Sequence, residues 1–197
     1  MTEKDKMLRG ILYDVSDPVL ADDRLRCKEM CHDYNSIRPK DLDGRTSLLR
    51  HLLGHISGEL LIEQPFYCDY GYNIGVGRNF YSNVNLVILD CAKVTFGDNV
   101  LIGPNCGFYT AGHPLDIADR NKGLEYARPI TVGDNVWIGA GVSVLPGVTI
   151  GDNCVIGAGS VVNRDIPSDS VAVGNPCRVV RKLTSPPRAT RSEARDE

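Results

Sequence analysis

Aliphatic residues recur at every sixth position over much of this sequence. From Val132 onward the chain divides into the hexads VGDNVW, IGAGVS, VLPGVT, IGDNCV, IGAGSV and VNRDIP, each beginning with Ile or Val. The second residue is often Gly, and the fifth is usually small or apolar. The same division works upstream for FGDNVL from Phe96 and IGPNCG from Ile102, and weakens before them. A period of six fits neither a helix nor a simple alternating strand, so the pattern indicates a repeat fold.

The physical interpretation of this period is a solenoid whose coils have three flat sides. The aliphatic first residue of each hexad points inward and stacks on its equivalents, while Gly and Asn allow the backbone conformations needed near the corners. The pattern is typical of the hexapeptide-repeat, left-handed parallel β-helix. The handedness comes from this resemblance, because the general crossover rule favours right-handed connections. We therefore predict a mainly β chain with a left-handed parallel β-helix over residues 59–183.

Both ends of the chain depart from the hexad pattern. DPVLADDRLRCKEMCHDYNSI starts with Asp-Pro, a good helix start, and DLDGRTSLLRHLLGHI carries an apolar stripe of helical spacing. We expect a small α-helical cap over residues 1–58 that packs on the first coils. Residues 184–197 are polar with paired prolines, and we expect this tail to be disordered.

Charge and composition narrow the class of protein. A net charge of −3 on 197 residues gives no electrostatic reason to expect nucleic acid or an anionic membrane as partner. The first ten residues, MTEKDKMLRG, lack the apolar core of a signal peptide, and no apolar run is long enough to span a bilayer. We expect a soluble, cytoplasmic protein.

Seven cysteines raise the question of disulfides or metal. Without a secretory signal, reduced thiols are expected. Cys27 and Cys31 lie one helical turn apart and could form half of a metal site, but no second Cys/His pair at suitable spacing accompanies them. Cys106 and Cys154 fall at repeat positions that favour small apolar side chains and are expected in the core. We therefore expect no metal.

The repeat is interrupted between residues 111 and 129, where the chain is polar and predicted to form a projecting loop. This segment contains His113, flanked by Gly112 and Pro114, and the other three histidines lie in the predicted cap. A loop histidine can simply be solvated. An imidazole at the one interruption of a rigid scaffold is also the natural group to take a proton from a hydroxyl.

Specific stretches outside the generic hexads resemble the maltose/galactoside O-acetyltransferase family of hexapeptide acyltransferases. They include LRGILYDVSDPVL, CDYGYNI, GRNFYSNVN, TAGHPLD, RPITVGDNVWIG and GNPCRVVRKL, and the resemblance covers roughly residues 8–183. CDYGYNI and HPLD are more similar to the maltose branch. The resemblance implies a homotrimer with active sites between subunits, acetyl-CoA as donor and a sugar hydroxyl as acceptor. Transfer is then direct, without an acetyl-enzyme.

The resemblance also implies roles for individual residues around the acceptor. His113 matches the family's catalytic base, and Asn83 matches an asparagine that contacts the acceptor and stabilises the tetrahedral intermediate. Asp69 stands where the galactoside enzymes bind the sugar with a serine. Cys91 stands where they carry an aspartate, a departure that leaves the sugar open. Asp17 and Glu125 are further candidates for acceptor contact, and Glu125 could alternatively orient His113.

For coenzyme A the resemblance points to the C-terminal coils. The candidate cofactor-binding residues are Ala140, Ala158, Asn163, Arg164, Arg178 and Arg181. Small residues let a pantetheine arm lie close to the backbone, and arginines suit phosphate. The alternative is that RVVRK is only a basic end of the solenoid. Trp137 is expected to pack beside the cofactor groove.

Other functions are known for hexapeptide solenoids. A zinc hydrase of the carbonic anhydrase type needs three histidines per metal, which one solenoid histidine per chain does not supply. A non-catalytic trimeric scaffold is the non-enzyme alternative, although it would have no reason to keep the GHP, SNVN and CRVVRK set together. Within the enzymes, the alternative is an acetyltransferase for another hydroxylated acceptor, such as a chitooligosaccharide, an amino alcohol or an antibiotic.

Overall fold

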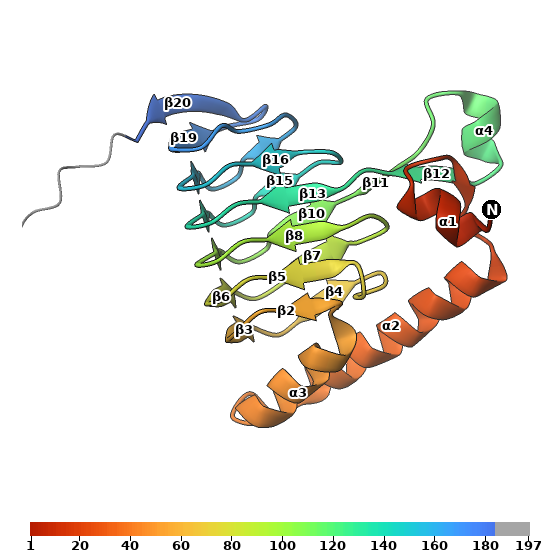
Figure 1. Cartoon of the computed structure of the whole chain (residues 1–197), viewed down its shortest axis with the longest axis horizontal. Helices are drawn as coiled ribbons and strands as arrows, with labels where there is room; N and C mark the ends of the chain where they lie inside the picture. The colour runs from red at the N-terminus through yellow and green to blue at the C-terminus, as the bar shows by residue number, and fades with distance from the viewer. Residues whose placement is uncertain (184–197) are drawn as a thin grey trace, which may run out of the picture.

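The protein is described by a computed structural model over residues 1–183, and the predicted disordered tail at 184–197 lies outside the described residues. A parallel β-solenoid forms the body, helices cover its first coils, and one excursion projects from its side (Figure 1). The mainly β architecture predicted from the hexads is confirmed. No helix between residues 1 and 183 is long and apolar enough to cross a membrane.

Three parallel sheets make the flat sides of the solenoid. Sheet I contains β4 (Phe66–Cys68), β7 (Leu86–Leu89), β10 (Gly107–Tyr109), β15 (Ser143–Val144) and β18 (Val161–Val162). Sheet II contains β2 (His55–Ile56), β5 (Ile74–Val76), β8 (Val94–Phe96), β13 (Ile130–Val132) and β16 (Thr149–Ile150). Sheet III contains β3 (Leu60–Ile62), β6 (Phe80–Ser82), β9 (Leu101–Ile102), β14 (Trp137–Ile138), β17 (Val155–Ile156), β19 (Ser170–Val173) and the antiparallel β20 (Arg178–Lys182).

The interior of the solenoid is filled by the residues that define the period of six. The first residues of the C-terminal hexads, from Val132 to Val162, are at most 1% exposed. The fifth positions, including Cys154 and Ser160, are buried as well. Burying a Val or Ile side chain contributes roughly 1.5–3 kcal/mol, so each residue of this column stabilises the solenoid. Cys106 and Cys154 lie in the core as predicted.

The turns from sheet II to sheet III are built from repeated Asp-Asn pairs, and we call this edge the asparagine corner. Asn99, Asn135 and Asn153 adopt left-handed φ values of 57°, 56° and 56°, which Asn tolerates better than most residues. The Nδ2 of Asn99 donates to Oδ1 of Asn135 at 3.0 Å, and Asn135 donates to Asn153 at 3.1 Å. The polar groups of this corner therefore satisfy one another along the coil axis.

Three helices of the N-terminal region begin at residues suited to helix starts. α1 (Glu3–Leu8) begins with a capping box at Thr2, α2 (Pro18–Ser36) follows Asp17, and α3 (Leu42–Leu52) follows Asp41. α2 packs against β4, and its buried face includes Leu20, Cys27, Cys31 and Tyr34. α2 and α3 thus cover the first coils, whereas α1 packs against β1 (Tyr13–Asp14) and β12 (Leu124–Ala127). Sheet II begins at β2, immediately after α3.

The interruption at residues 111–129 is more ordered than a simple loop. It contains β11 (Ala111–Gly112), the short α4 (Ile117–Asn121) and β12 (Leu124–Ala127). β12 also pairs with β1 (Tyr13–Asp14), giving an antiparallel sheet in the order β1-β12-β11. Figure 1 shows this sheet and α4 at the side of the solenoid, next to α1. The loop prediction missed the hairpin because its second strand is completed by residues about a hundred positions away.

Candidate active site

Chemistry-bearing residues gather at the turns from sheet I to sheet II, an edge that we call the loop corner. Asp69 follows β4, Asp90 and Cys91 follow β7, and the excursion that carries His113 follows β10. These strands are neighbours in sheet I, so residues far apart in the sequence lie in adjacent coils. The loop corner therefore brings together candidates that sequence could only place one at a time.

His113 follows β11 and keeps a 57% exposed side chain. Its Nδ1 lies 3.3 Å from the carbonyl oxygen of Leu124. Since a carbonyl only accepts, this contact assigns the proton of the neutral ring to Nδ1 and leaves Nε2 with a free lone pair. Nε2 lies 3.7 Å from Oε1 of Glu125. The ring therefore presents its basic nitrogen beside a carboxylate.

Glu125 links this histidine to the N-terminal region. It lies on β12 opposite Tyr13 in the β1-β12 pairing, and its Oε2 accepts a 2.7 Å hydrogen bond from the Tyr13 hydroxyl. Tyr13 is buried, and burial raises the pKa of its hydroxyl far above the usual value, so it remains a donor. One oxygen of Glu125 is thus fixed by Tyr13, and the other faces His113.

A cavity of about 230 Å³ opens at the same corner. It is lined by Val15, Arg24, Lys28, Asp69, Tyr70, Cys91 and Glu125. Three predicted acceptor contacts, Asp69, Cys91 and Glu125, are therefore side by side, and Glu125 connects them to His113. Two cations of α2, Arg24 and Lys28, complete the lining, and neither was among the predicted site residues.

The carboxyl and thiol groups of the cavity are interdependent. Cys91 donates through Sγ to Oδ2 of Asp69 at 3.6 Å. Burial raises the pKa of Asp69 above its usual value, and burial together with the Asp69 charge raises the pKa of Cys91. Cys91 is therefore a neutral thiol at neutral pH, suited to hydrogen bonding and unsuited to nucleophilic attack.

Asp90 supports this corner from inside. Its side chain is fully buried and its Oδ1 accepts hydrogen bonds from the backbone N–H groups of Asp69 at 3.1 Å and Tyr70 at 2.9 Å. Its backbone carbonyl accepts a 2.7 Å bond from Nδ2 of Asn73. Burial raises the pKa of Asp90 to about 6. Asp90 thus fixes the backbone that presents Asp69.

Asp17 lies directly before the first residue of α2. It is the N-cap of α2, and its Oδ1 accepts from the backbone N–H groups of Val19 at 3.0 Å and Leu20 at 3.2 Å. It is not among the residues that line the cavity. Asp17 therefore caps α2, and its role as an acceptor contact stays a prediction.

Asn83 lies at the opposite end of sheet I, at the turns from sheet III to sheet I. Ala140 and Ala158 occupy equivalent turns in later coils, and we call this edge the glycine corner. Oδ1 of Asn83 accepts from the backbone N–H of Val84 at 2.8 Å, so its amide nitrogen points elsewhere. A strand of four residues such as β7 (Leu86–Leu89) spans roughly 13 Å, so Asn83 and His113 occupy different corners of one chain.

The glycine corner has a surface of small residues and closely stacked backbone. Gly159 N–H donates to the Ala140 carbonyl at 2.8 Å. A Cβ added at Gly139 would stand 2.7 Å from the backbone nitrogen of Ala158, so no larger residue fits there without a shift. Ala140 and Ala158 are themselves exposed. The corner is therefore a narrow, side-chain-poor track along the coils.

The remaining cofactor candidates lie at the last coils. Asn163 follows β18, and Arg178 donates through Nη1 to its Oδ1 at 3.3 Å. Arg164 and Arg181 are exposed. Within residues 1–183, none of these three arginines forms an ion pair. Their cationic groups are available to an anionic ligand.

Trp137 lies on the surface of sheet III, three residues before Ala140 of the glycine corner, and its packing beside a bound cofactor stays a prediction. Its side chain is 57% exposed on β14, beside Leu101 on β9, which is 48% exposed. Successive side chains of a strand point to opposite faces, so Leu101 and Trp137 face away from the core, whereas Ile102 and Ile138, which follow them, are buried. Trp137 is thus part of an exposed apolar patch on sheet III.

Comparison with known proteins gives this fold and site a family. The model of the maltose acetyltransferase hexapeptide capping motif matches residues 6–58, and that of the six-repeat bacterial transferase hexapeptide matches residues 129–164. A Saccharomyces cerevisiae protein named provisionally as an acetyltransferase is 56% identical over 91% of this chain and 92% of its own length.

Two solved structures agree with this assignment over almost the whole chain. A maltose O-acetyltransferase from Clostridium difficile 630 is 50% identical, with a TM-score of 0.92 over 93% of this chain and 98% of its own. A galactoside acetyltransferase solved with coenzyme A is 44% identical, with a TM-score of 0.90 over 93% of this chain and 92% of its own. Fold and site define an acyltransferase of the hexapeptide-repeat class. The chain belongs to the maltose/galactoside O-acetyltransferase family and is an acetyltransferase.

Proposed function

We propose that the protein transfers an acetyl group from acetyl-CoA to a hydroxyl group of a sugar or a similar polyol, with His113 as general base. The observation that carries this proposal is the convergence of His113, through Glu125, on the cavity that also contains Asp69. The family's coenzyme A-bound relative supports the donor.

In the proposed step the acceptor hydroxyl binds between the cavity and Nε2 of His113. Nε2 takes the hydroxyl proton as the oxygen attacks the thioester carbonyl carbon, and a tetrahedral intermediate forms. When the carbon–sulfur bond breaks, the imidazolium returns the proton to the departing thiolate of coenzyme A. Because Nδ1 stays hydrogen-bonded to Leu124, the ring keeps its orientation throughout. The carboxylate of Glu125, 3.7 Å from Nε2, stabilises the imidazolium while it exists.

Acceptor recognition in this proposal depends on the polar lining of the cavity. Asp69 accepts hydrogen bonds from two hydroxyls, and Arg24 and Lys28 donate to ring or glycosidic oxygens. Cys91 gives this site a weak thiol donor where the galactoside enzymes carry a carboxylate. The resulting charge balance suits a neutral polyol.

We further propose that coenzyme A lies along the glycine corner. Ala140 and Ala158 leave room for the pantetheine arm against the backbone, and Asn163, Arg164, Arg178 and Arg181 bind the phosphates and the nucleotide end. Acyl transfer then requires this track to meet His113.

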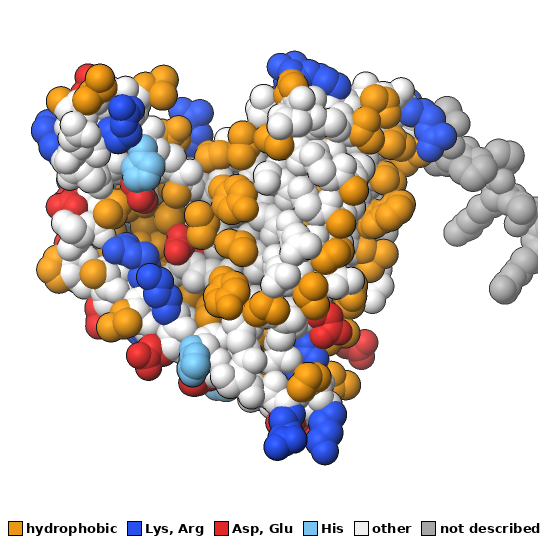
Figure 2. All heavy atoms as spheres, turned by 180° about the vertical axis from the view of Figure 1, so that it is seen from behind, with side chains coloured by type: hydrophobic (Ala, Val, Ile, Leu, Met, Phe, Trp, Pro, Cys, Tyr) orange, Lys and Arg blue, Asp and Glu red, His pale blue; other side chains and the backbone are white. Residues whose placement is uncertain are grey.

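In this proposal a homotrimer brings the coenzyme A track of one subunit to His113 of another. Asn83 and the small-residue track lie at one end of sheet I and His113 at the other, so a neighbouring subunit must bring the glycine corner of one chain to the loop corner of another. The amide nitrogen of Asn83 then donates to the developing oxyanion. Figure 2 shows hydrophobic side chains along the solenoid face, which is otherwise poor in charge, and the patch of Leu101 and Trp137 is suited to burial between subunits.

Incubation with acetyl-CoA and maltose, glucose or a galactoside, followed by free-thiol detection, tests the activity. We expect acceptor-dependent release of one coenzyme A thiol for each acetyl ester formed. Thiol release without an acetylated acceptor, or binding of coenzyme A without turnover on any hydroxylated acceptor, contradicts the proposal. A positive result with an amino alcohol alone would replace the sugar and keep the acetyl transfer.

Mixed oligomers test the shared site separately. His113→Ala and Asn83→Ala chains are each expected to be nearly inactive, whereas co-refolded mixtures regain activity because some interfaces combine two intact residues. Light scattering on the same samples measures the mass, which should equal three chains. A monomer that turns over at full rate contradicts the shared site.

A further inference from the structure

Three buried cysteines meet where the helix α2 packs on the first coils. Cys27 and Cys31 lie one turn apart on α2, and Cys68 ends β4. Their side chains are 2%, 2% and 6% exposed. The Sγ of Cys68 lies 3.5 Å from that of Cys27 and 3.8 Å from that of Cys31, and all three sulfur atoms lie within 4.8 Å of one another. The sequence supplied only the helical pair, because Cys68 is brought to it by tertiary packing.

The spacing of the sulfur atoms is that of a metal–thiolate site. A metal–sulfur bond of about 2.3 Å separates sulfur ligands by about 3.8 Å in tetrahedral and about 4.0 Å in trigonal geometry. The distances of 3.5 and 3.8 Å between the Cys68 sulfur and the other two are close to those values. A cation can therefore enter with only small movements of the three side chains.

Cation binding would displace the thiol protons of the cluster, because a metal is ligated by thiolates. The affinity of the site is therefore expected to rise with pH.

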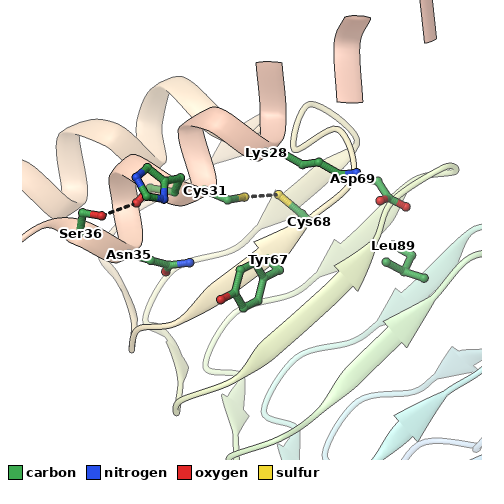
Figure 3. Close-up of a pocket in the computed structure, with 9 residues that line it drawn as sticks. Lys28, Cys31, Asn35, Ser36, Tyr67, Cys68, Asp69 and Leu89 are labelled. Atoms are coloured by element: carbon green, nitrogen blue, oxygen red, sulfur yellow. Dashed lines mark hydrogen bonds between the residues drawn. The ribbon is translucent and has the colours of Figure 1, made fainter. Parts of the chain in front are cut away.

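A cavity of about 410 Å³ gives access to the cluster from outside. Cys31 and Cys68 form part of its wall, together with Lys28, His32 and Tyr67. Figure 3 shows the two sulfur atoms pointing toward each other between α2 and β4, with Asp69 next along the chain. An ion can thus reach the cluster without unfolding of the N-terminal helices.

We propose that Cys27, Cys31 and Cys68 bind one soft, thiophilic d10 cation, and that three-coordinate Cu(I) fits the site better than Zn(II). Thiolates select soft cations. Zn(II) prefers four ligands, whereas the cysteine cluster supplies three among residues 1–183. Three ligands suit Cu(I) better. The ion would join α2 to β4 and so stabilise the folded chain against unfolding, since the unfolded chain has no preformed site.

A competition titration of the full, freshly reduced chain under anaerobic conditions tests the site. Cu(I) is supplied as its complex with bicinchoninate, whose colour reports the copper that the protein removes. We expect one equivalent per chain, a higher thermal unfolding midpoint, and three sulfur neighbours per copper by X-ray absorption. Cys68→Ser and Cys31→Ser should each weaken binding by more than about a hundredfold, which exceeds the loss seen for residues that only support a ligand.

Cys154→Ser is the matched control, because Cys154 is buried in the solenoid away from the cluster and should leave Cu(I) binding unchanged. Circular dichroism shows whether each variant is folded, and Cys31→Ser changes a side chain at the cavity wall if Cys68→Ser does not fold. Failure of the wild type to compete for Cu(I) while all seven thiols titrate as free overturns the site. Tight Zn(II) binding that depends on the same cysteines, with weaker Cu(I) binding, retains the site and overturns the choice of ion.

Discussion

The asparagine corner and the loop corner are built on the same solenoid and treat their polar groups in opposite ways. At the asparagine corner each amide bonds to the equivalent amide one coil away, so the edge is satisfied by its own repetition. At the loop corner the period is broken, and Asp69, Cys91 and Glu125 are left facing a cavity, with His113 beside Glu125. Polar side chains that are not hydrogen-bonded to an equivalent residue of the next coil are the ones available to a substrate.

Replacement of His113 by Ala should give the largest effect on the loop corner. Loss of a general base is expected to lower kcat by about a hundred- to ten-thousand-fold, while coenzyme A binding and assembly stay unchanged. Thiol release measures turnover, and His55→Ala serves as control because His55 is exposed in the first coil. Full activity in the His113 variant would exclude it as the base.

Asp90 provides the second test, through the pH dependence of stability. Its pKa of about 6 in the folded chain lies above the ordinary carboxyl value of 3.8, so the folded state holds the proton longer than the unfolded state. Protonated Asp90 therefore contributes about 3 kcal/mol to the free energy of unfolding below about pH 4. This contribution is lost as the pH rises through about 6. The free energy of unfolding of the wild type should fall relative to that of Asp90→Asn across this window in urea titrations. Parallel curves would show that Asp90 titrates normally.

A substitution at the asparagine corner should affect stability and leave catalysis intact. Asn135→Ala removes ladder hydrogen bonds and places an ordinary residue at a φ of 56°, which together should cost about 2 kcal/mol. Asn135→Gly keeps the conformation accessible and should cost about half as much. Chemical denaturation measures both. Equal losses for the two variants would mean that backbone strain makes no contribution.

The smaller of the two expected effects on catalysis is that of Glu125→Gln. The amide keeps a hydrogen-bond acceptor for Tyr13 and removes the negative charge beside the His113 imidazolium, so kcat should fall by about tenfold, equivalent to about 1.4 kcal/mol. Glu59→Gln, an exposed change at the asparagine corner, is the matched control. A rise in the acceptor KM without a change in kcat would instead make Glu125 an acceptor contact.

The hexads predicted the solenoid well because each one places a buried residue by local spacing alone. Val132 and Ile138 needed no knowledge of distant residues to be assigned to the core. The hairpin at the loop corner could not be predicted in the same way, because β12 (Leu124–Ala127) is completed by β1 (Tyr13–Asp14) from the other end of the sequence. Arg24, Lys28 and Cys68 were not predicted as site residues for the same reason, because their partners in space are distant in the sequence.

For the candidate site too, the sequence named individual residues, and the structure showed which of them lie together. Motif resemblance named His113, Asn83 and Asp69, and the structure placed Asp69 with Cys91 and Glu125 in one cavity. Asp17 caps α2, which the Asp-Pro sequence at that position already indicated, and its contact with the acceptor stays a prediction.

The sequence by itself determined the repeat, its buried column and the position at which the repeat is interrupted, because these follow from residue type at fixed spacing. Only the tertiary structure decided which residues meet: Tyr13 with Glu125, Asp69 with Cys91, and Cys68 with the cysteines of α2. Such contacts depend on how coils stack and how the N-terminal helices cover them. Local propensity contains no information about either, so the chemistry at the loop corner and in the thiol cluster emerges only after folding.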